Sequence, residues 1–443
     1  MFETDSLLDL KHATELMEQG FGTLPPFEVA EMGNKATAIL ADVAERMQDN
    51  YPYAHPLYAG QMLKPPHPIA RAAYSLAMQI NPNNHALDGG RASSVLEKEA
   101  VANLAAMFGW NTHIGHLCGG GTMANMEALW IAKQEGGGAV VASEQGHYTH
   151  SRLTEVLNIP FHSVPVDHNA QMDISALETL LKQKQVGTVV VTLGTTGVGS
   201  VDPLHKILEL RKSYAFRIHV DAAYGGYHCL IDSLADNAHQ AFSRIAEVDS
   251  IVIDPHKHGL QPYGCGCVLF RDPQIGRHYK HDSPYTYFSS TELHLGEISL
   301  ECSRPGAAAT ALWATQQLLP MQPGGEFALG LESGRNAALA LYHLICDDDS
   351  QLAIFEPELD IVLWAPKASA ASKISEMSSR AFAQCAEKNL HLALVTLPSV
   401  LLQSHWPEVA FDTESVVCIR SCLMKPEHAQ WVDRIWEIYK EMC

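Results

Sequence analysis

Two residues in this chain could act together on a carbonyl compound, a lysine and an aspartate that each follow an apolar stretch. Lys257 ends the segment Asp254-Pro255-His256-Lys257, which comes directly after the apolar run at residues 250–253. A lysine placed just past a buried strand can have its amine desolvated, and such an amine attacks carbonyl groups. The alternative is an ordinary solvent-facing loop lysine, and this segment alone does not decide between the two.

Asp221 lies 257 − 221 = 36 residues before Lys257 and ends the apolar run at residues 217–220. Open α/β sheets place functional groups at the carboxyl ends of their strands. Pyridoxal phosphate requires such a carboxylate to keep its pyridine nitrogen protonated, because the protonated ring is the electron sink. A helix N-cap is the common alternative for an aspartate, but the nearby lysine segment favours the cofactor role.

Two further segments suit the same cofactor. The run Cys118-Gly119-Gly120-Gly121-Thr122 opens a predicted helix, where backbone N–H groups can bind a phosphate. It is neither a Walker motif nor a dinucleotide fingerprint, and a flexible loop is the alternative interpretation. His147 follows the short apolar run at residues 139–142, where its ring could stack on a flat cofactor.

Together these segments resemble the pyridoxal-phosphate-dependent group II amino-acid decarboxylases, which include glutamate, aromatic-amino-acid and archaeal tyrosine decarboxylases. The resemblance runs from about His55 to about Trp313 in order and spacing. It is most specific at His219-Val220-Asp221-Ala222-Ala223-Tyr224-Gly225 and at Asp254-Pro255-His256-Lys257, and looser in the C-terminal part. It implies the pyridoxal-phosphate fold type I, which is aspartate-aminotransferase-like.

The resemblance also implies roles for individual residues. Lys257 would hold the cofactor as an imine and Asp221 would pair with the pyridine nitrogen. The remaining implied cofactor contacts are His147 stacking on one face of the ring, Ala223 packing on the other, Gly121, Thr122 and His256 at the phosphate, and Thr196 near the ring substituents. Arg304, in Ser303-Arg304-Pro305-Gly306, resembles the arginine that holds the substrate carboxylate, and its planar fork suits that task. A surface arginine is the alternative.

Three places depart from the family pattern or leave its interpretation open. Asp254 stands where many relatives carry asparagine, and His258 follows the lysine where aromatic-amino-acid decarboxylases carry tryptophan. The segment around Tyr285 and Tyr287 falls where the family has a mobile loop whose tyrosine protonates the intermediate. A surface aromatic hairpin is an equal alternative there.

The resemblance implies decarboxylation of an L-amino acid to the corresponding amine and carbon dioxide, in a homodimer with the active site at the subunit interface. In this scheme a tyrosine or His147 returns the proton to Cα. One rival keeps the cofactor and cleaves a carbon–carbon bond to an aldehyde, as sphingosine-phosphate-lyase-like relatives do. A second rival is a catalytically inactive scaffold of the same fold. The substrate side chain stays open between acidic, aromatic and diamino acids.

Apolar periodicity predicts the elements that must position these residues. Buried strands are expected at residues 139–142, 188–193, 217–221, 250–253 and 267–270, with amphipathic helices at 94–108, 175–183 and 204–213. Continuous β-branched runs separated by helices indicate a mainly parallel sheet covered on both faces. Residues 88–94, just before Glu97, are expected to form a capping box for the helix that follows.

The expected organisation has three parts. Residues 1–60 form an N-terminal helical arm, residues 61–318 the large cofactor-binding domain, and residues 319–443 a small C-terminal α/β domain. The small domain should contain strands near residues 360–364, 392–397 and 416–420, a helix at 375–386 and a closing amphipathic helix at 431–442.

Composition excludes several other classes of protein. The chain has 443 residues with 30 basic and 50 acidic side chains, so its formal charge of −20 disfavours nucleic-acid and membrane-surface partners. No signal-peptide pattern opens the chain and no apolar run approaches the ~18–20 residues that span a bilayer. The ten scattered cysteines indicate reduced thiols in a cytoplasmic protein. No metal site is predicted, since the best local cluster, His113, His116 and Cys118, has no supporting ligand.

Overall fold

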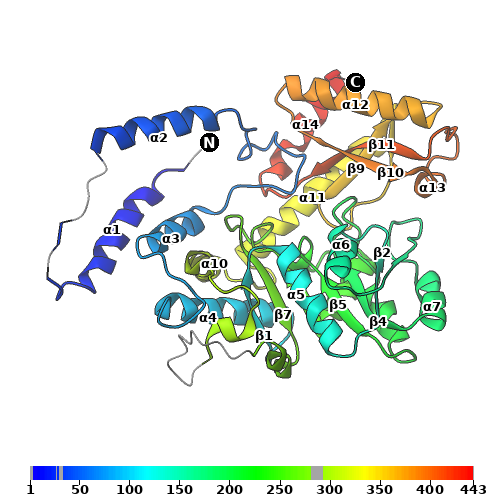
Figure 1. The fold of residues 1–443 in the computed structure, drawn as a ribbon. Helices are drawn as coiled ribbons and strands as arrows, with labels where there is room; N and C mark the ends of the chain where they lie inside the picture. The colour runs from blue at the N-terminus through cyan, green and yellow to red at the C-terminus, as the bar shows by residue number, and fades with distance from the viewer. Residues whose placement is uncertain (1–2, 26, 29–32, 281–292, 443) are drawn as a thin grey trace.

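The computed structural model describes residues 3–25, 27–28, 33–280 and 293–442. A seven-stranded sheet forms its centre, in the order β1-β7-β6-β5-β4-β2-β3 (Figure 1). Its strands are β1 (Ile114–Cys118), β2 (Ala139–Ser143), β3 (Phe161–Val164), β4 (Val186–Thr192), β5 (Arg217–Asp221), β6 (Ser250–Ile253) and β7 (Gly266–Phe270). Only β7 among them runs antiparallel to its neighbours, β1 and β6. The predicted mainly parallel α/β sheet is confirmed.

Helices follow the strands because the connections of a parallel sheet must cross its faces. In chain order they are α4 (Arg91–Met107), α5 (Gly121–Gln134), α6 (Thr149–Val156), α7 (Ile174–Gln183), α8 (Leu204–Leu210), α9 (Asp236–Ser243) and α10 (Gly306–Leu318). Short 3₁₀ turns lie at η1 (Gly226–Leu230), η2 (Ile245–Glu247), η3 (Pro273–His278) and η4 (Leu295–Ile298). Every residue of β2, β6 and β7 is buried, as expected for strands covered on both faces.

A second, antiparallel sheet has the order β10-β11-β9-β8. Its strands are β8 (Gln351–Ala353), β9 (Ile361–Pro366), β10 (Ala393–Pro398) and β11 (Ser415–Cys422). The accompanying helices are α11 (Glu326–Cys346), α12 (Ala371–Glu387), α13 (Ser399–Leu402) and α14 (His428–Met442). One continuous apolar cluster includes Leu193 and Val198 beside the central sheet and Ile361 in β9, so the two sheets share a core.

The N-terminal helices α1 (Ser6–Gln19) and α2 (Gly33–Met47) extend to one side of the molecule, while α3 (Pro68–Met78) packs on α10 (Figure 1). The chain between α2 and α3 runs along the second sheet, where the N–H of Ala59 donates to the carbonyl of His391. The division into parts ending at residues 60 and 318 stays a prediction.

Two local findings refine the sequence analysis. The capping box expected at residues 88–94 is wrong, because the N-cap of α4 is Gly90 and no side chain caps the helix. Glu97 turns instead toward Asn84 and Arg304 in the interior. Within the described residues, no helix is long and apolar enough to cross a bilayer.

Candidate active site

A cavity of about 570 Å³ opens at the carboxyl ends of the parallel strands. Such an edge is where open α/β sheets bind ligands. The polar side chains that line it come from the ends of β4, β5 and β6, from the start of α5, and from loops. They are Thr122, Asn125, His147, Thr149, Thr192, Thr196, Asp221, Tyr224, Asp254, His256, Lys257, Tyr263 and Glu301. Most of the residues singled out from the sequence therefore meet at one place.

Lys257 lies in the turn after β6 and points into this cavity. It is the only lysine or arginine among the described residues of the cavity wall. Its Nζ atom forms an ion pair with Oδ2 of Asp254 at 3.1 Å, and the same oxygen lies 3.5 Å from His256 Nε2. The carboxylate of Asp254 thus faces the amine of Lys257. Asp254, which stands where many relatives carry asparagine, therefore lies within the site.

Asp221, the last residue of β5, is buried at the floor of the cavity. One oxygen accepts a hydrogen bond from the backbone N–H of Ala223 at 3.1 Å, and the other accepts one from Asn125 Nδ2 at 3.3 Å. His150 Nε2 lies 3.0 Å from that second oxygen. Burial alone would raise the pKa of Asp221, but His150 and Lys257 outweigh it and hold the pKa well below its usual range. Asp221 is therefore ionised whenever the protein is folded near neutral pH.

The residues that hold Asp221 were missed by the sequence analysis. Asn125 on α5 accepts a hydrogen bond from His219 Nε2 at 2.8 Å, and His219 Nδ1 contacts Ser250 Oγ at 2.9 Å. Burial lowers the pKa of His219 to about 3, so this histidine is neutral. The amide orientation of Asn125 is fixed by this chain of bonds, because only its Nδ2 can donate to the carboxylate. Only one feature of the sequence indicated His150: it lies three residues after His147, close to the start of α6.

The glycine run before α5 forms a tight cradle. Gly120 has a φ of +146°, and a Cβ placed on Gly121 would lie 2.8 Å from Asp254 Oδ2. A side chain at residue 121 is therefore excluded, and the first turn of α5 lines the cavity, as an anion site at a helix N-terminus requires. The N–H of Gly119 donates to Glu301 Oε2 at 3.3 Å. His256 flanks the cradle with its Nδ1 bonded to the carbonyl of Cys265 at 2.8 Å.

The walls of the cavity suit a flat ring. His147 lies at one side, with Nδ1 bonded to Thr149 Oγ1 at 2.7 Å, and burial lowers its pKa. Ala223 and Thr196 also line the cavity. A carboxylate, a glycine cradle and a lysine amine around one cavity match the pyridine nitrogen, phosphate and aldehyde of pyridoxal phosphate. The residues present fit this cofactor.

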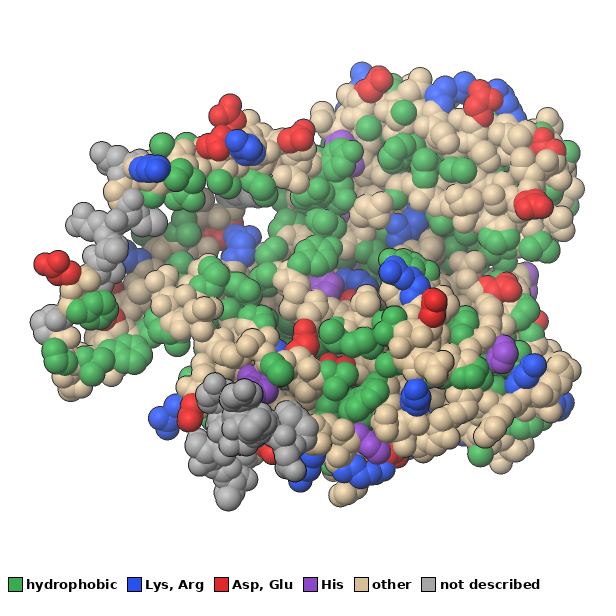
Figure 2. All heavy atoms as spheres, in the orientation of Figure 1, with side chains coloured by type: hydrophobic (Ala, Val, Ile, Leu, Met, Phe, Trp, Pro, Cys, Tyr) green, Lys and Arg blue, Asp and Glu red, His purple; other side chains and the backbone are tan. Residues whose placement is uncertain are grey.

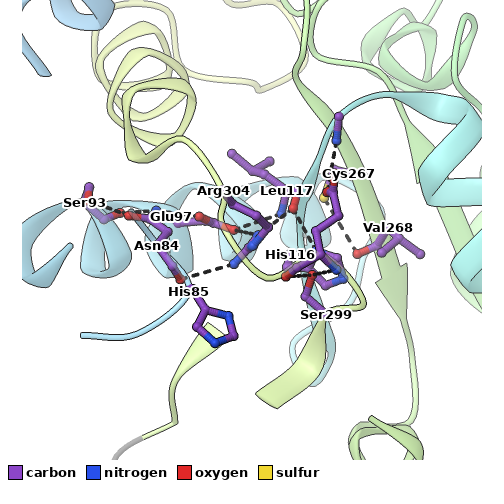
Figure 3. Close-up of polar contacts among 12 residues, drawn as sticks. Asn84, His85, Ser93, Glu97, His116, Leu117, Cys267, Val268, Ser299 and Arg304 are labelled. Carbon is purple, nitrogen blue, oxygen red and sulfur yellow. Dashed lines mark hydrogen bonds and ion pairs between the residues drawn. The ribbon is translucent and has the colours of Figure 1, made fainter. Parts of the chain in front are cut away.

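Arg304 does not line the cavity. Its guanidinium is buried and bonded to Glu97 Oε1 at 2.7 Å and to the carbonyl of Leu117 at 2.6 Å (Figure 3). Glu97 also accepts from Asn84 and from the N–H of Leu117, so the network ties α4 to β1 and to the loop before α10. The structure thus commits Arg304 to an internal ion pair, and its predicted contact with a substrate carboxylate has no support in this geometry.

A different arginine lies behind the cavity wall and contacts one of its residues. Arg420, on β11 of the second sheet, donates from Nη2 to the carbonyl of Thr196 at 2.8 Å and from Nη1 to that of Gly60 at 3.3 Å. Its Nε is buried without a hydrogen-bond partner. The sequence analysis missed Arg420 because nothing local in the sequence links β11 to Thr196. Tyr285 and Tyr287, the candidate lid tyrosines, lie outside the described residues.

The fold and this cavity define a class, the lysine-dependent α/β proteins of pyridoxal-phosphate fold type I. Residues 22–322 match the family described as "Pyridoxal-dependent decarboxylase conserved domain". The chain therefore belongs to the pyridoxal-phosphate-dependent amino-acid decarboxylase family, which confirms the resemblance seen in its sequence and identifies its cofactor as pyridoxal phosphate.

Individual relatives agree with this assignment. The chain is 31% identical over 252 residues to a probable L-tyrosine/L-aspartate decarboxylase of Methanothrix thermoacetophila. The aligned segment covers 56% of this chain and 63% of the relative. A protein of the same description from Methanothermobacter thermautotrophicus is 27% identical, and the aligned segment covers 68% of this chain and 81% of that protein. The chain thus spans less than two thirds of the first of these relatives. The crystal structure of mouse CSAD superposes with a TM-score of 0.80 over 100% of this chain and 92% of its own, at 19% identity, which confirms the fold.

Proposed function

We propose that this protein removes the α-carboxylate of an L-amino acid as carbon dioxide and releases the amine. One observation carries the proposal: Lys257, the ionised Asp221 and the glycine cradle before α5 all face a single cavity. Pyridoxal phosphate, when bound, supplies the electron sink for the bond that breaks. The family to which the chain belongs supports the same reaction.

The chain's own residues divide the remaining work. Asp221 would hold a proton on the ring nitrogen through its negative charge, and the cradle before α5 would bind the phosphate. Lys257 would supply the amine that carries the cofactor and would accept protons at Nζ, with Asp254 as its counter-charge at 3.1 Å. His147, which lines the cavity and whose pKa is lowered by burial, would contact the ring and hold or release a proton.

Arg420 is the proposed partner of the substrate carboxylate. It contacts Thr196 at the cavity wall, its Nε has no partner, and a guanidinium binds a carboxylate through two parallel hydrogen bonds. The Arg420→Gln variant should raise KM for the amino acid by about tenfold or more, since a hydrogen bond to a charged group is worth ~1.5–3 kcal/mol. Steady-state kinetics with an unchanged cofactor spectrum would support this role, and an unchanged KM would contradict it.

The substrate is proposed from the relatives. Tyrosine and aspartate, named in the descriptions of similar proteins, are the first amino acids to test. The purified holoenzyme should have a visible absorption band that borohydride bleaches, and carbon dioxide should form with at least one of them. Lys257→Ala should lack the band and lose about 10²-fold or more of the activity. A colourless wild type that stays colourless with added cofactor would exclude the proposal, and an aldehyde product would favour the rival lyase.

We further propose a cytoplasmic homodimer. Within the described residues all nine cysteines are free thiols, which suits a reducing compartment. The arm helices carry exposed apolar side chains, seen as green spheres along the arm in Figure 2. They include Leu7, Leu8 and Leu16 on α1 and Ile39, Leu40, Val43 and Met47 on α2. An apolar face of this extent on a protruding arm indicates a protein partner, and a second copy of the chain is the proposed one.

A further inference from the structure

Three buried side chains from distant parts of the sequence meet behind the cofactor lysine. His228 lies in η1, His258 directly follows Lys257, and Asp360 directly precedes β9. Their exposed fractions are 0%, 1% and 1%. Nε2 of His258 lies 3.3 Å, and Nε2 of His228 4.0 Å, from the same oxygen of Asp360. One ligand atom of each residue lies within 4.8 Å of those of the other two.

The ring nitrogens of this cluster make no aligned hydrogen bonds. Nδ1 and Nε2 of both His228 and His258 are buried, and the approach of the two Nε2 atoms to Asp360 is their only polar contact among the described ion pairs. Buried polar groups are normally satisfied. Imidazole nitrogens without hydrogen-bond partners are available as metal ligands.

The charge of Asp360 is also incompletely compensated. Its Oδ1 accepts a hydrogen bond from Tyr224 at 2.6 Å, but among the described ion pairs its only partners are these two histidines. A buried carboxylate needs a nearby positive charge. Lys64 contributes some of it from a distance, but its amine donates to the carbonyl of Met424 at 3.0 Å.

We propose that His228, His258 and Asp360 bind a divalent transition-metal ion of the Zn²⁺ type. Two imidazoles and one carboxylate are a donor set that such ions favour, whereas Mg²⁺ and Ca²⁺ prefer all-oxygen sites. Tetrahedral Zn²⁺ holds its ligand atoms about 3.3 Å apart, given bonds of ~2.0–2.1 Å. The 3.3 and 4.0 Å separations therefore need only small side-chain shifts.

The adjoining cavity would give the metal ion access to the site and would provide its fourth ligand. His258 lines a second cavity of about 620 Å³, which also contains Lys64. The bound ion would connect η1, the lysine turn and the start of β9. Tyr224, which lines the cofactor cavity, would orient the carboxylate ligand.

The holoenzyme, stripped of metal with a chelator and dialysed, should then bind about one Co²⁺ or Zn²⁺ per chain. Co²⁺ bound to these ligands should show visible ligand-field absorption that Zn²⁺ displaces, and metal content is measured independently by plasma mass spectrometry. His228→Ala and Asp360→Asn should each weaken binding at least tenfold, whereas His239→Ala, which removes an exposed histidine, should leave it unchanged. Lys64→Met should strengthen binding, because it removes a repelling charge.

Far-UV circular dichroism and the cofactor spectrum establish which variants are folded. The unsubstituted holoenzyme also tests the proposal without any substitution, through the Co²⁺ spectrum. Absence of ligand-field absorption with stoichiometric Co²⁺, or metal binding equal in wild type and folded Asp360→Asn, would overturn the assignment.

Discussion

The carboxylate of Asp221 is buried, so its charge has to be stabilised within the protein. The N–H of Ala223, the amide of Asn125 and the imidazole of His150 do so at 3.1, 3.3 and 3.0 Å. The ionised form needed to hold a protonated pyridine is thus prepared before the cofactor arrives.

Removing His150 should shift the acid limb of the pH profile of kcat to higher pH. The lowered pKa of Asp221 keeps it ionised down to low pH. Because His150 contributes to that lowering, His150→Leu should raise the pKa, so the acid limb of kcat moves to higher pH and kcat falls about 10- to 100-fold. The pH profile of kcat for wild type and variant measures this. The exposed His239→Leu is the control, and an acid limb that stays in place would show that His150 does not act through Asp221.

The sequence could predict Asp221 and Lys257 because each lies at or just after the carboxyl end of a short strand with apolar residues. It could not predict the true environment of Arg304, since Glu97 lies 207 residues away and only the folded chain brings them together. Arg420 could not be predicted for the same reason, because the residue to which it donates a hydrogen bond, Thr196, is 224 positions away in the sequence. Local pattern thus predicted which strand ends carry chemistry, whereas the pairing of buried charges depends on tertiary packing.

Among the elements, α5 combines two proposed roles near its N-terminus. Its first residues form the proposed phosphate cradle, and Asn125, one turn later, donates to Asp221. The position of this helix would therefore set the distance between the proposed phosphate site and the proposed ring-nitrogen site. The close fit accounts for glycine at 121, where a Cβ would lie 2.8 Å from Asp254 Oδ2, and the φ of +146° accounts for glycine at 120.

Gly121→Ala should weaken cofactor binding without unfolding the protein. The new Cβ would lie 2.8 Å from Asp254 Oδ2, and relieving that contact should cost ~1–3 kcal/mol, or roughly 5- to 150-fold in affinity. Titration of the apoenzyme with pyridoxal phosphate gives the affinity. Gly136→Ala is the matched control, because a Cβ there meets nothing within 4 Å. Equal affinities of the two variants would refute the cradle.

At the scale of the whole molecule, the apolar arm predicts the assembly. Wild type should sediment as a dimer, and replacing Ile39 and Leu40 on α2 with aspartate should produce monomers, since two charges cannot be buried in an apolar interface. Analytical ultracentrifugation across a concentration series measures the equilibrium. Val400→Asp, at another exposed apolar position, should leave it unchanged. A monomeric wild type would contradict the proposed dimer.

The hydrogen bond between Arg420 and Thr196 also has a consequence during protein synthesis. These residues are 224 positions apart, so a ribosome that adds ~5–20 residues per second needs on the order of 10–45 s to make the second after the first. Once β7 has been completed at Phe270, every strand of the central sheet exists, while the segment that contacts Thr196 has not yet been made. The nascent chain therefore exposes an unfinished cavity to the cell, and capture of the vitamin-derived cofactor in its final surroundings must wait until Arg420 has been made and the second sheet has formed.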